Sequence, residues 1–159
     1  MSAVGDLHDL LRAGGATIAV AESLTGGLLG AELTSVAGSS VTFLGGITAY
    51  ATPAKVGLLR VDDALLARGG AVQPEVALAM ARGARSRFAS TYAVALTGVA
   101  GPDPQDGVPP GTVHVAFVGP DGEQVRSLHL PGDRADVRAA AVRSALALAL
   151  EQLAVPGGG

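Results

Sequence analysis

Short apolar runs and helix-patterned stretches alternate along most of this chain. The apolar runs are bounded by glycine, proline or polar residues, which is typical of buried strands. They predict strands at residues 17–21, 43–50 and 92–96, and Gly45-Gly46 marks a bulge or a close backbone approach in the second. Helical spacing of apolar residues predicts helices over residues 8–11, 27–35, 53–59, 62–67, 73–88 and 134–153.

The last third of the chain changes pattern. Residues 112–118 and 124–130 read as two strands joined at Pro120-Asp121-Gly122, which predicts a hairpin. Strands that alternate with helices and then end in a hairpin indicate a three-layer α/β/α sandwich with a mixed central sheet. Ligand sites in such folds lie after the carboxyl ends of strands, so the loops 22–27, 50–55 and 97–110 are the candidate site.

Composition narrows the class of protein. The length of 159 residues suits one domain, expected over residues 1–155, followed by a flexible tail at 156–159. The chain has no cysteine, which removes disulfides, thiol catalysis and cysteine-based zinc sites. The net charge is −3 without a basic patch, so no nucleic-acid partner is expected. No signal pattern and no apolar run of roughly 18 residues is found, so we expect a cytoplasmic protein that does not bind membranes.

Two features of the sequence point to chemistry. The segment 21–27, Ala-Glu-Ser-Leu-Thr-Gly-Gly, brings a serine, a threonine and glycines to a predicted helix start, where backbone N–H groups favour anions. Taken alone, the segment fits a plain Ser/Thr helix cap in a tight turn better than a binding site. Lys55 is the only lysine beside ten arginines, and lysine, unlike arginine, loses its proton when desolvated.

Several sequence blocks occur in an order that resembles one family. They are AESLTGG at 21–27, GGITAY at 45–50 with Lys55 following, LLRV at 58–61, GAV at 70–72, PEVA at 74–77, MA at 80–81, TGVAGP at 97–102, PGTV at 110–113 and GDR at 132–134. Together they cover almost the whole chain. The chain resembles the CinA carboxy-terminal domain family, the nicotinamide-nucleotide amidohydrolases, in a stand-alone form without the larger amino-terminal domain that family members often carry.

The resemblance implies hydrolysis of the carboxamide of nicotinamide mononucleotide to nicotinate mononucleotide and ammonia. It implies no metal, no organic cofactor, a small nucleotide as substrate and a homo-oligomer, dimeric or higher. Amide hydrolysis needs a nucleophile and a base that later acts as an acid. The resemblance gives these roles to Ser23 and Lys55, and it implies that Tyr50 and Thr97, which lie in matching blocks, orient the pair or bind the carboxamide. Thr97 fits equally well as the plain end of a strand. A covalent acyl-enzyme and a water activated by the pair both remain open.

The substrate phosphate needs hydrogen-bond donors and positive charge. Candidate binding residues are the helix start Thr25, Gly26 and Gly27, the turn with Gly98, Ala100 and Gly101, and the side chains of Arg134 and Arg138. Glu22 either begins the following helix as an acid or holds Lys55, and the sequence does not decide between them. His8, His114 and His129 lack metal-ligand spacing and are interpreted as structural, and Asp103 and Asp106 as solvated loop residues.

The chain departs from the family pattern at two places. Position 24 is Leu where Cys is common, and the loop 103–109 has added prolines and acids. The altered loop leaves a related amide-bearing pyridine nucleotide open as the substrate. A second alternative is a non-catalytic nucleotide-binding sensor or scaffold linked to competence or DNA damage, against which the presence of Ser23 and Lys55 argues.

Overall fold

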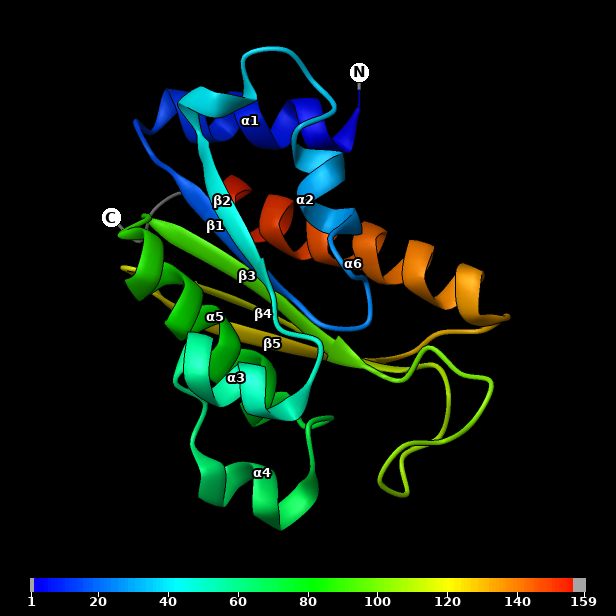
Figure 1. Cartoon of the computed structure of the whole chain (residues 1–159). Helices are drawn as coiled ribbons and strands as arrows, with labels where there is room; N and C mark the ends of the chain where they lie inside the picture. Colours follow the sequence, from blue (N-terminus) through cyan, green and yellow to red (C-terminus); the bar gives the residue numbers. More distant parts are fainter. Residues whose placement is uncertain (1, 156–159) are drawn as a thin grey trace.

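The structure, a computed structural model, describes residues 2–155, and the expected tail at 156–159 lies outside them. A five-stranded mixed sheet in the order β2-β1-β3-β4-β5 lies between two layers of helices (Figure 1). The strands are β1 (Ile18–Glu22), β2 (Phe43–Thr48), β3 (Tyr92–Gly98), β4 (Thr112–Gly119) and β5 (Gly122–His129). The helices are α1 (Ala3–Ala13), α2 (Leu28–Leu33), the short 3-10 helix η1 (Ser39–Val41), α3 (Thr52–Leu59), α4 (Asp63–Gly69), α5 (Pro74–Phe88) and α6 (Arg134–Ala154).

The predicted α/β/α sandwich is confirmed. β1 pairs in parallel with β2 and β3, whereas β4 pairs antiparallel with β3 and β5, as the predicted hairpin requires. Helices α1, α2 and α6 lie on one face of the sheet. Helix α5 covers the other face, and α3 and α4 pack against α5 (Figure 1). Within residues 2–155, no helix is both long and apolar enough to cross a membrane.

The two faces of the sheet carry side chains of different size. In β1 and β3, Val20, Val94 and Leu96 point into the core under α1 and α6, whereas Ala21, Ala93 and Ala95 point into the core under α5. Successive residues of a strand point to opposite faces, so this division follows directly from the sequence. The small alanine side chains let α5 lie close to the sheet. Alanines of α5 and Met80 pack against them.

The glycine pair in β2 meets the expected close contacts. A β-carbon on Gly46 would lie 2.6 Å from Val20 Cγ2, and one on Gly45 would lie 2.6 Å from the Phe88 ring. The β1–β2 register also shifts after Ile18, as the predicted bulge implies. Side chains larger than hydrogen are therefore excluded where β2 crosses its neighbours.

Element ends differ from the prediction by a few residues. Helix α2 is confined to Leu28–Leu33 because Gly27, with φ 108°, holds a left-handed conformation immediately before it. Strand β3 continues to Gly98 because Gly98 still pairs with Val113 of β4. The carboxyl ends of β1, β2 and β3 consequently lead into three loops at one edge of the sheet, as expected for the site.

Candidate active site

Ser23 and Lys55 meet at the carboxyl edge of the parallel strands. Ser23 directly follows β1, and Lys55 lies in the first turn of α3. The Lys55 ammonium donates to Ser23 Oγ at 2.9 Å, to the Ala49 carbonyl at 2.8 Å and to the Tyr50 carbonyl at 3.1 Å. The two residues expected to form a nucleophile–base pair are thus in direct hydrogen-bond contact.

The surroundings of Lys55 favour its neutral form. Its side chain is 1% exposed, and no ion pair with a carboxylate forms among residues 2–155. Desolvation by burial lowers the pKa of Lys55 from 10.5 to about 8. The Ala49 and Tyr50 carbonyls only accept, so when Lys55 is neutral its lone pair has one possible donor among these three partners, the Ser23 hydroxyl.

Glu22 is buried beside Ser23 but does not hold Lys55. Its Oε1 accepts from Thr25 Oγ1 at 2.6 Å and from the backbone N–H groups of Gly27 at 3.3 Å and Leu29 at 2.8 Å. Its Oε2 accepts from the Gly30 N–H at 3.0 Å. Of the two interpretations left open by the sequence, the structure has the helix-start acid, with the carboxylate on the first turn of α2.

The donors at this helix start, which the sequence suggested for binding a phosphate, are therefore already hydrogen-bonded to other groups of the protein. The Thr25 hydroxyl and the Gly27 N–H donate to Glu22, and the Gly26 N–H donates to the Ser23 carbonyl at 3.1 Å. Thr25 is fully buried. These three residues shape the turn that presents Ser23, and they do not line the cavity described next.

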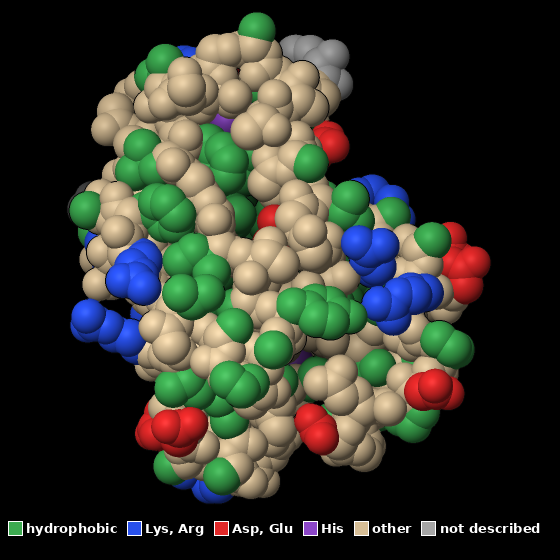
Figure 2. Space-filling view, in the orientation of Figure 1, with side chains coloured by type: hydrophobic (Ala, Val, Ile, Leu, Met, Phe, Trp, Pro, Cys, Tyr) green, Lys and Arg blue, Asp and Glu red, His purple; other side chains and the backbone are tan. Residues whose placement is uncertain are grey.

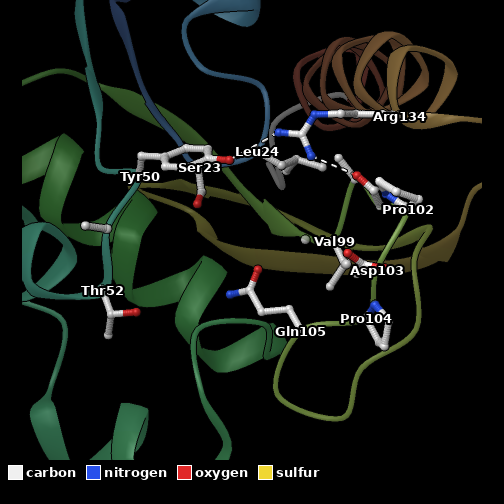
Figure 3. Close-up of a pocket in the computed structure, with 14 residues that line it drawn as sticks. Ser23, Leu24, Tyr50, Thr52, Val99, Pro102, Asp103, Pro104, Gln105 and Arg134 are labelled. Atoms are coloured by element: carbon white, nitrogen blue, oxygen red, sulfur yellow. Dashed lines mark hydrogen bonds between the residues drawn. The ribbon is translucent and has the colours of Figure 1, made fainter.

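A cavity of about 490 Å³ opens in front of Ser23. Figure 3 shows it between the Ser23 turn, the loop after β2 and the loop after β3. Its walls are made by Ser23, Leu24, Tyr50, Ala51, Thr52, Gly98, Val99, Ala100, Gly101, Pro102, Asp103, Pro104, Gln105 and Arg134. The expected turn residues Gly98, Ala100 and Gly101 are brought to the site, and the cavity has the size of small-molecule sites.

Arg134 brings positive charge to the cavity from the first turn of α6. Its guanidinium donates to the Gly101 carbonyl at 2.8 Å and to Tyr50 Oη at 3.2 Å, so it joins two of the loops (Figure 3). A capping box of Asp133 and Asp136 fixes this helix start. No carboxylate within residues 2–155 forms an ion pair with Arg134, which lines the cavity.

Several other predicted site residues do not line the cavity wall either. Glu22 and Lys55 lie behind Ser23, and Thr97 and Arg138 make contacts elsewhere. The Thr97 hydroxyl is buried and donates to the Ala71 carbonyl at 2.7 Å. Arg138 donates to the Leu24 carbonyl at 3.0 Å and to the Thr25 carbonyl at 3.4 Å, so α6 supports the Ser23 turn from behind. Among residues 2–155, no three His, Asp or Glu side chains lie together as a metal site would require.

Sequence reasoning missed several contributors. The carbonyls of Ala49 and Tyr50 hold the Lys55 ammonium, and no side-chain pattern reveals a backbone acceptor. Thr52 and Gln105 line the cavity, and Asp103, interpreted as a solvated loop residue, does so too. The one feature of the sequence that indicated these residues was their position in the loops after β2 and β3.

The surface charge around the cavity is divided. Figure 2 shows basic side chains near the start of α6 and acidic ones near the loop after β3.

Comparisons with known proteins agree on one family. The family model described as the CinA C-terminal domain matches residues 2–153. A CinA-like protein of Frankia casuarinae is 55% identical over 139 residues, which are 87% of this chain and 32% of that protein. The chain spans about a third of the length of the curated relatives it matches.

Solved structures agree with this assignment. The competence damage-inducible protein A (ComA) of Klebsiella pneumoniae superposes with a TM-score of 0.93 at 32% identity, over 96% of each chain. The competence/damage inducible protein CihA of Agrobacterium tumefaciens superposes with a TM-score of 0.84 at 36% identity, over 94% of this chain and 96% of that one.

Proposed function

Because this chain belongs to the CinA C-terminal domain family, we propose that it hydrolyses the carboxamide of nicotinamide mononucleotide to nicotinate mononucleotide and ammonia. The observation that carries the proposal is the 2.9 Å contact between Lys55 Nζ and Ser23 Oγ, with Lys55 buried and its pKa lowered to about 8. At pH 7 a group of that pKa is neutral in roughly one molecule in ten. A buried neutral lysine beside a serine is a general base beside a nucleophile.

In the first half of the reaction, Ser23 Oγ forms a bond to the carboxamide carbon and its proton passes to Lys55 Nζ. Collapse of the tetrahedral intermediate breaks the carbon–nitrogen bond, and Lys55 returns the proton to the leaving nitrogen, which departs as ammonia. In the second half, a water attacks the acyl-serine ester, Lys55 takes its proton, and the proton returns to Ser23 Oγ as nicotinate mononucleotide leaves.

The charge in the cavity fits the rest of this substrate. Arg134 presents a guanidinium without an ion-pair partner at the cavity wall, and guanidinium groups pair well with phosphate oxygens. We therefore assign the 5′-phosphate to Arg134. Tyr50 shares a hydrogen bond with Arg134 and lines the same wall, so it belongs to the substrate-binding group of residues.

Ammonia release from nicotinamide mononucleotide tests the proposal. The wild-type chain, Ser23→Ala and Lys55→Arg are compared at pH 8, with each variant checked for folding by circular dichroism. We expect both variants to lose activity by about a thousandfold or more. Lys55→Arg keeps the charge and removes the group that loses a proton, which separates a base from a binding cation.

Two further arms separate the alternatives. The intact dinucleotide and free nicotinamide are offered beside the mononucleotide, and preference for another of them would redirect the proposal to a related substrate. Hydroxylamine in the assay intercepts an acyl-serine as a hydroxamate, which a directly activated water would not give. A wild-type chain that binds the mononucleotide tightly and releases no ammonia would overturn catalysis and favour a sensor.

A further inference from the structure

We propose that Asp103 makes the cavity selective for a ligand whose ring carries a fixed positive charge, the pyridinium ring, over the same ligand with an uncharged ring. The inference rests on the proposed function, because it assigns the ring of that substrate to this cavity. Asp103 would then be a specificity-determining residue supplied by the loop that departs from the family pattern.

The charge of Asp103 is not used within the protein. Its side chain lines the same cavity as Ser23 and Arg134, beside Val99 (Figure 3). Within residues 2–155 it forms no hydrogen bond and no ion pair, since the acidic partners of the three ion pairs are Asp9, Glu123 and Glu151. A carboxylate on a cavity wall without an internal partner is available to a ligand.

Asp103 and Arg134 are the two charged side chains among the residues that line the cavity. They have opposite signs, and they are not paired with each other. A ligand that carries both a phosphate and a pyridinium ring has the complementary pair of charges. A neutral or purely anionic ligand would satisfy Arg134 alone and would leave Asp103 without a partner or close to an anion.

The loop that carries Asp103 is fixed at its tip. Gln105 and Val108 exchange backbone hydrogen bonds of 3.0 and 2.8 Å around a tight turn. Asp106 and Gly107 have φ values of 51° and 77°, as a type I′ turn requires. A β-carbon on Gly70 would lie 2.6 Å from Asp106 Oδ2, so the tip packs against the segment between α4 and α5.

The loop is also fixed at its roots. The Arg134 guanidinium donates to the Gly101 carbonyl at 2.8 Å at one end of the loop. At the other end, Gly111 donates to the Val99 carbonyl at 2.8 Å. With its tip and both roots held, the loop keeps Asp103 at one place on the cavity wall, which is what selection by charge requires.

The test compares nicotinamide mononucleotide with its reduced form, which keeps the carboxamide, ribose and phosphate and lacks the ring charge. Binding of each is measured by calorimetry to the full chain with Ser23→Ala, which prevents turnover, and to Ser23→Ala/Asp103→Asn. We expect Asp103→Asn to weaken binding of the oxidised nucleotide by roughly fivefold, as for a partly exposed charge pair, and of the reduced one by less than about twofold.

Asp106→Asn, in the same Ser23→Ala background, is the matched control. It removes the same charge from the same loop, its side chain is not part of the cavity wall, and asparagine tolerates the left-handed conformation of this position. We expect the two affinities to keep their wild-type ratio in this variant. An equal change of the ratio by Asp106→Asn would assign the effect to the net charge of the loop and would overturn the role of Asp103.

Two results of the Asp103→Asn measurement would also overturn the inference. Equal weakening for both nucleotides would assign Asp103 to the ribose, and unchanged affinities would return it to a solvated loop residue. Because binding is measured without hydrolysis, a wild-type chain that releases no ammonia overturns the proposed function and leaves charge selection standing. A chain that binds neither nucleotide overturns both.

Discussion

Two buried charged side chains flank the Ser23 turn, and the protein treats them in opposite ways. Glu22, 2% exposed, is surrounded by donors, namely the Thr25 hydroxyl and the N–H groups of Gly27, Leu29 and Gly30. Lys55, 1% exposed, has only neutral acceptors, and its pKa is lowered to about 8. Glu22 thus meets hydrogen-bond donors on a helix start, whereas Lys55 is buried without any partner of opposite charge.

This difference separates a structural role from a chemical one. A buried carboxylate that accepts four hydrogen bonds from the residues of a helix start fixes the local backbone, here the turn that carries Ser23. A buried lysine without a carboxylate sits near the point where it gains and loses a proton, which is what a base must do. Substitutions of Glu22 and of Lys55 can be made separately. We expect the first to change mainly stability and the second mainly catalysis.

The largest effect is expected when the Glu22 carboxylate is removed. Glu22→Ala leaves the Thr25 hydroxyl and the helix-start N–H groups without their acceptor, and we expect the free energy of unfolding to fall by about 3 kcal/mol. Urea denaturation followed by circular dichroism measures it. Glu32→Ala is the control, because Glu32 lies on the same helix, is exposed, and should change stability by less than about 0.5 kcal/mol. Equal effects of the two variants would contradict the structural role of Glu22.

On the Lys55 side, the pH dependence of catalysis gives the next largest effect. If neutral Lys55 is the base, kcat/KM for the proposed substrate follows its neutral fraction, and a pKa of about 8 makes it rise with pH. We expect roughly a 50-fold increase between pH 6 and pH 8, levelling off above that. Binding of the substrate to Ser23→Ala over the same range is the control for titration of the phosphate. A profile that is flat after this correction would remove Lys55 as the base.

The sequence predicted the framework of the site well, for physical reasons. Apolar runs and helical spacing specify which residues are buried, so the three parallel strands and the loops at their carboxyl ends could be located. A serine at a strand–helix turn and a solitary lysine drew attention to Ser23 and Lys55, and the resemblance to the CinA family supplied their expected roles. That they meet at 2.9 Å depends on the order of strands in the sheet, which places β1 next to β2.

The partners of the polar side chains could not be predicted in the same way. Glu22 had two interpretations because both a helix start and a lysine were expected nearby, and only the three-dimensional arrangement chooses between them. Thr97 matched a family block, yet its hydroxyl donates to the Ala71 carbonyl 26 positions earlier in the chain. Contacts of side chains with a distant backbone leave no pattern in the sequence, and Arg138 with Leu24 is a second example.

Replacing Lys55 tests its lowered pKa through the pH dependence of stability. Between pH 8 and 10.5 the folded chain has lost the Lys55 proton and the unfolded chain still holds it, so unfolding takes up a proton and the free energy of unfolding rises with pH. Relative to Lys55→Met, which has no proton to lose, we expect the wild type to gain about 1.4 kcal/mol per pH unit in this window, and nothing below it. Denaturation of both proteins from pH 6 to 10 measures the difference, in which shared tyrosine titration cancels. Parallel curves would mean that burial does not lower the pKa of Lys55.

The smallest effect is expected when a single hydrogen-bond donor to Glu22 is removed. Thr25→Val keeps the shape of a fully buried side chain and removes the 2.6 Å hydrogen bond to Glu22 Oε1, while the N–H donors of α2 remain. We expect a loss of about 1 kcal/mol in the free energy of unfolding, well below that of Glu22→Ala, because the carboxylate keeps its other partners.

Thr34→Val is the control for this substitution, since Thr34 is exposed at the end of the same helix and its hydroxyl donates only to nearby carbonyls. If Thr25→Val costs as much as Glu22→Ala, the hydroxyl and not the helix start is what stabilises the buried carboxylate. If it costs no more than Thr34→Val, the backbone N–H groups hold Glu22 unaided. Either result would show how much the helix start and the hydroxyl each contribute to stabilising the buried Glu22 carboxylate beside Ser23.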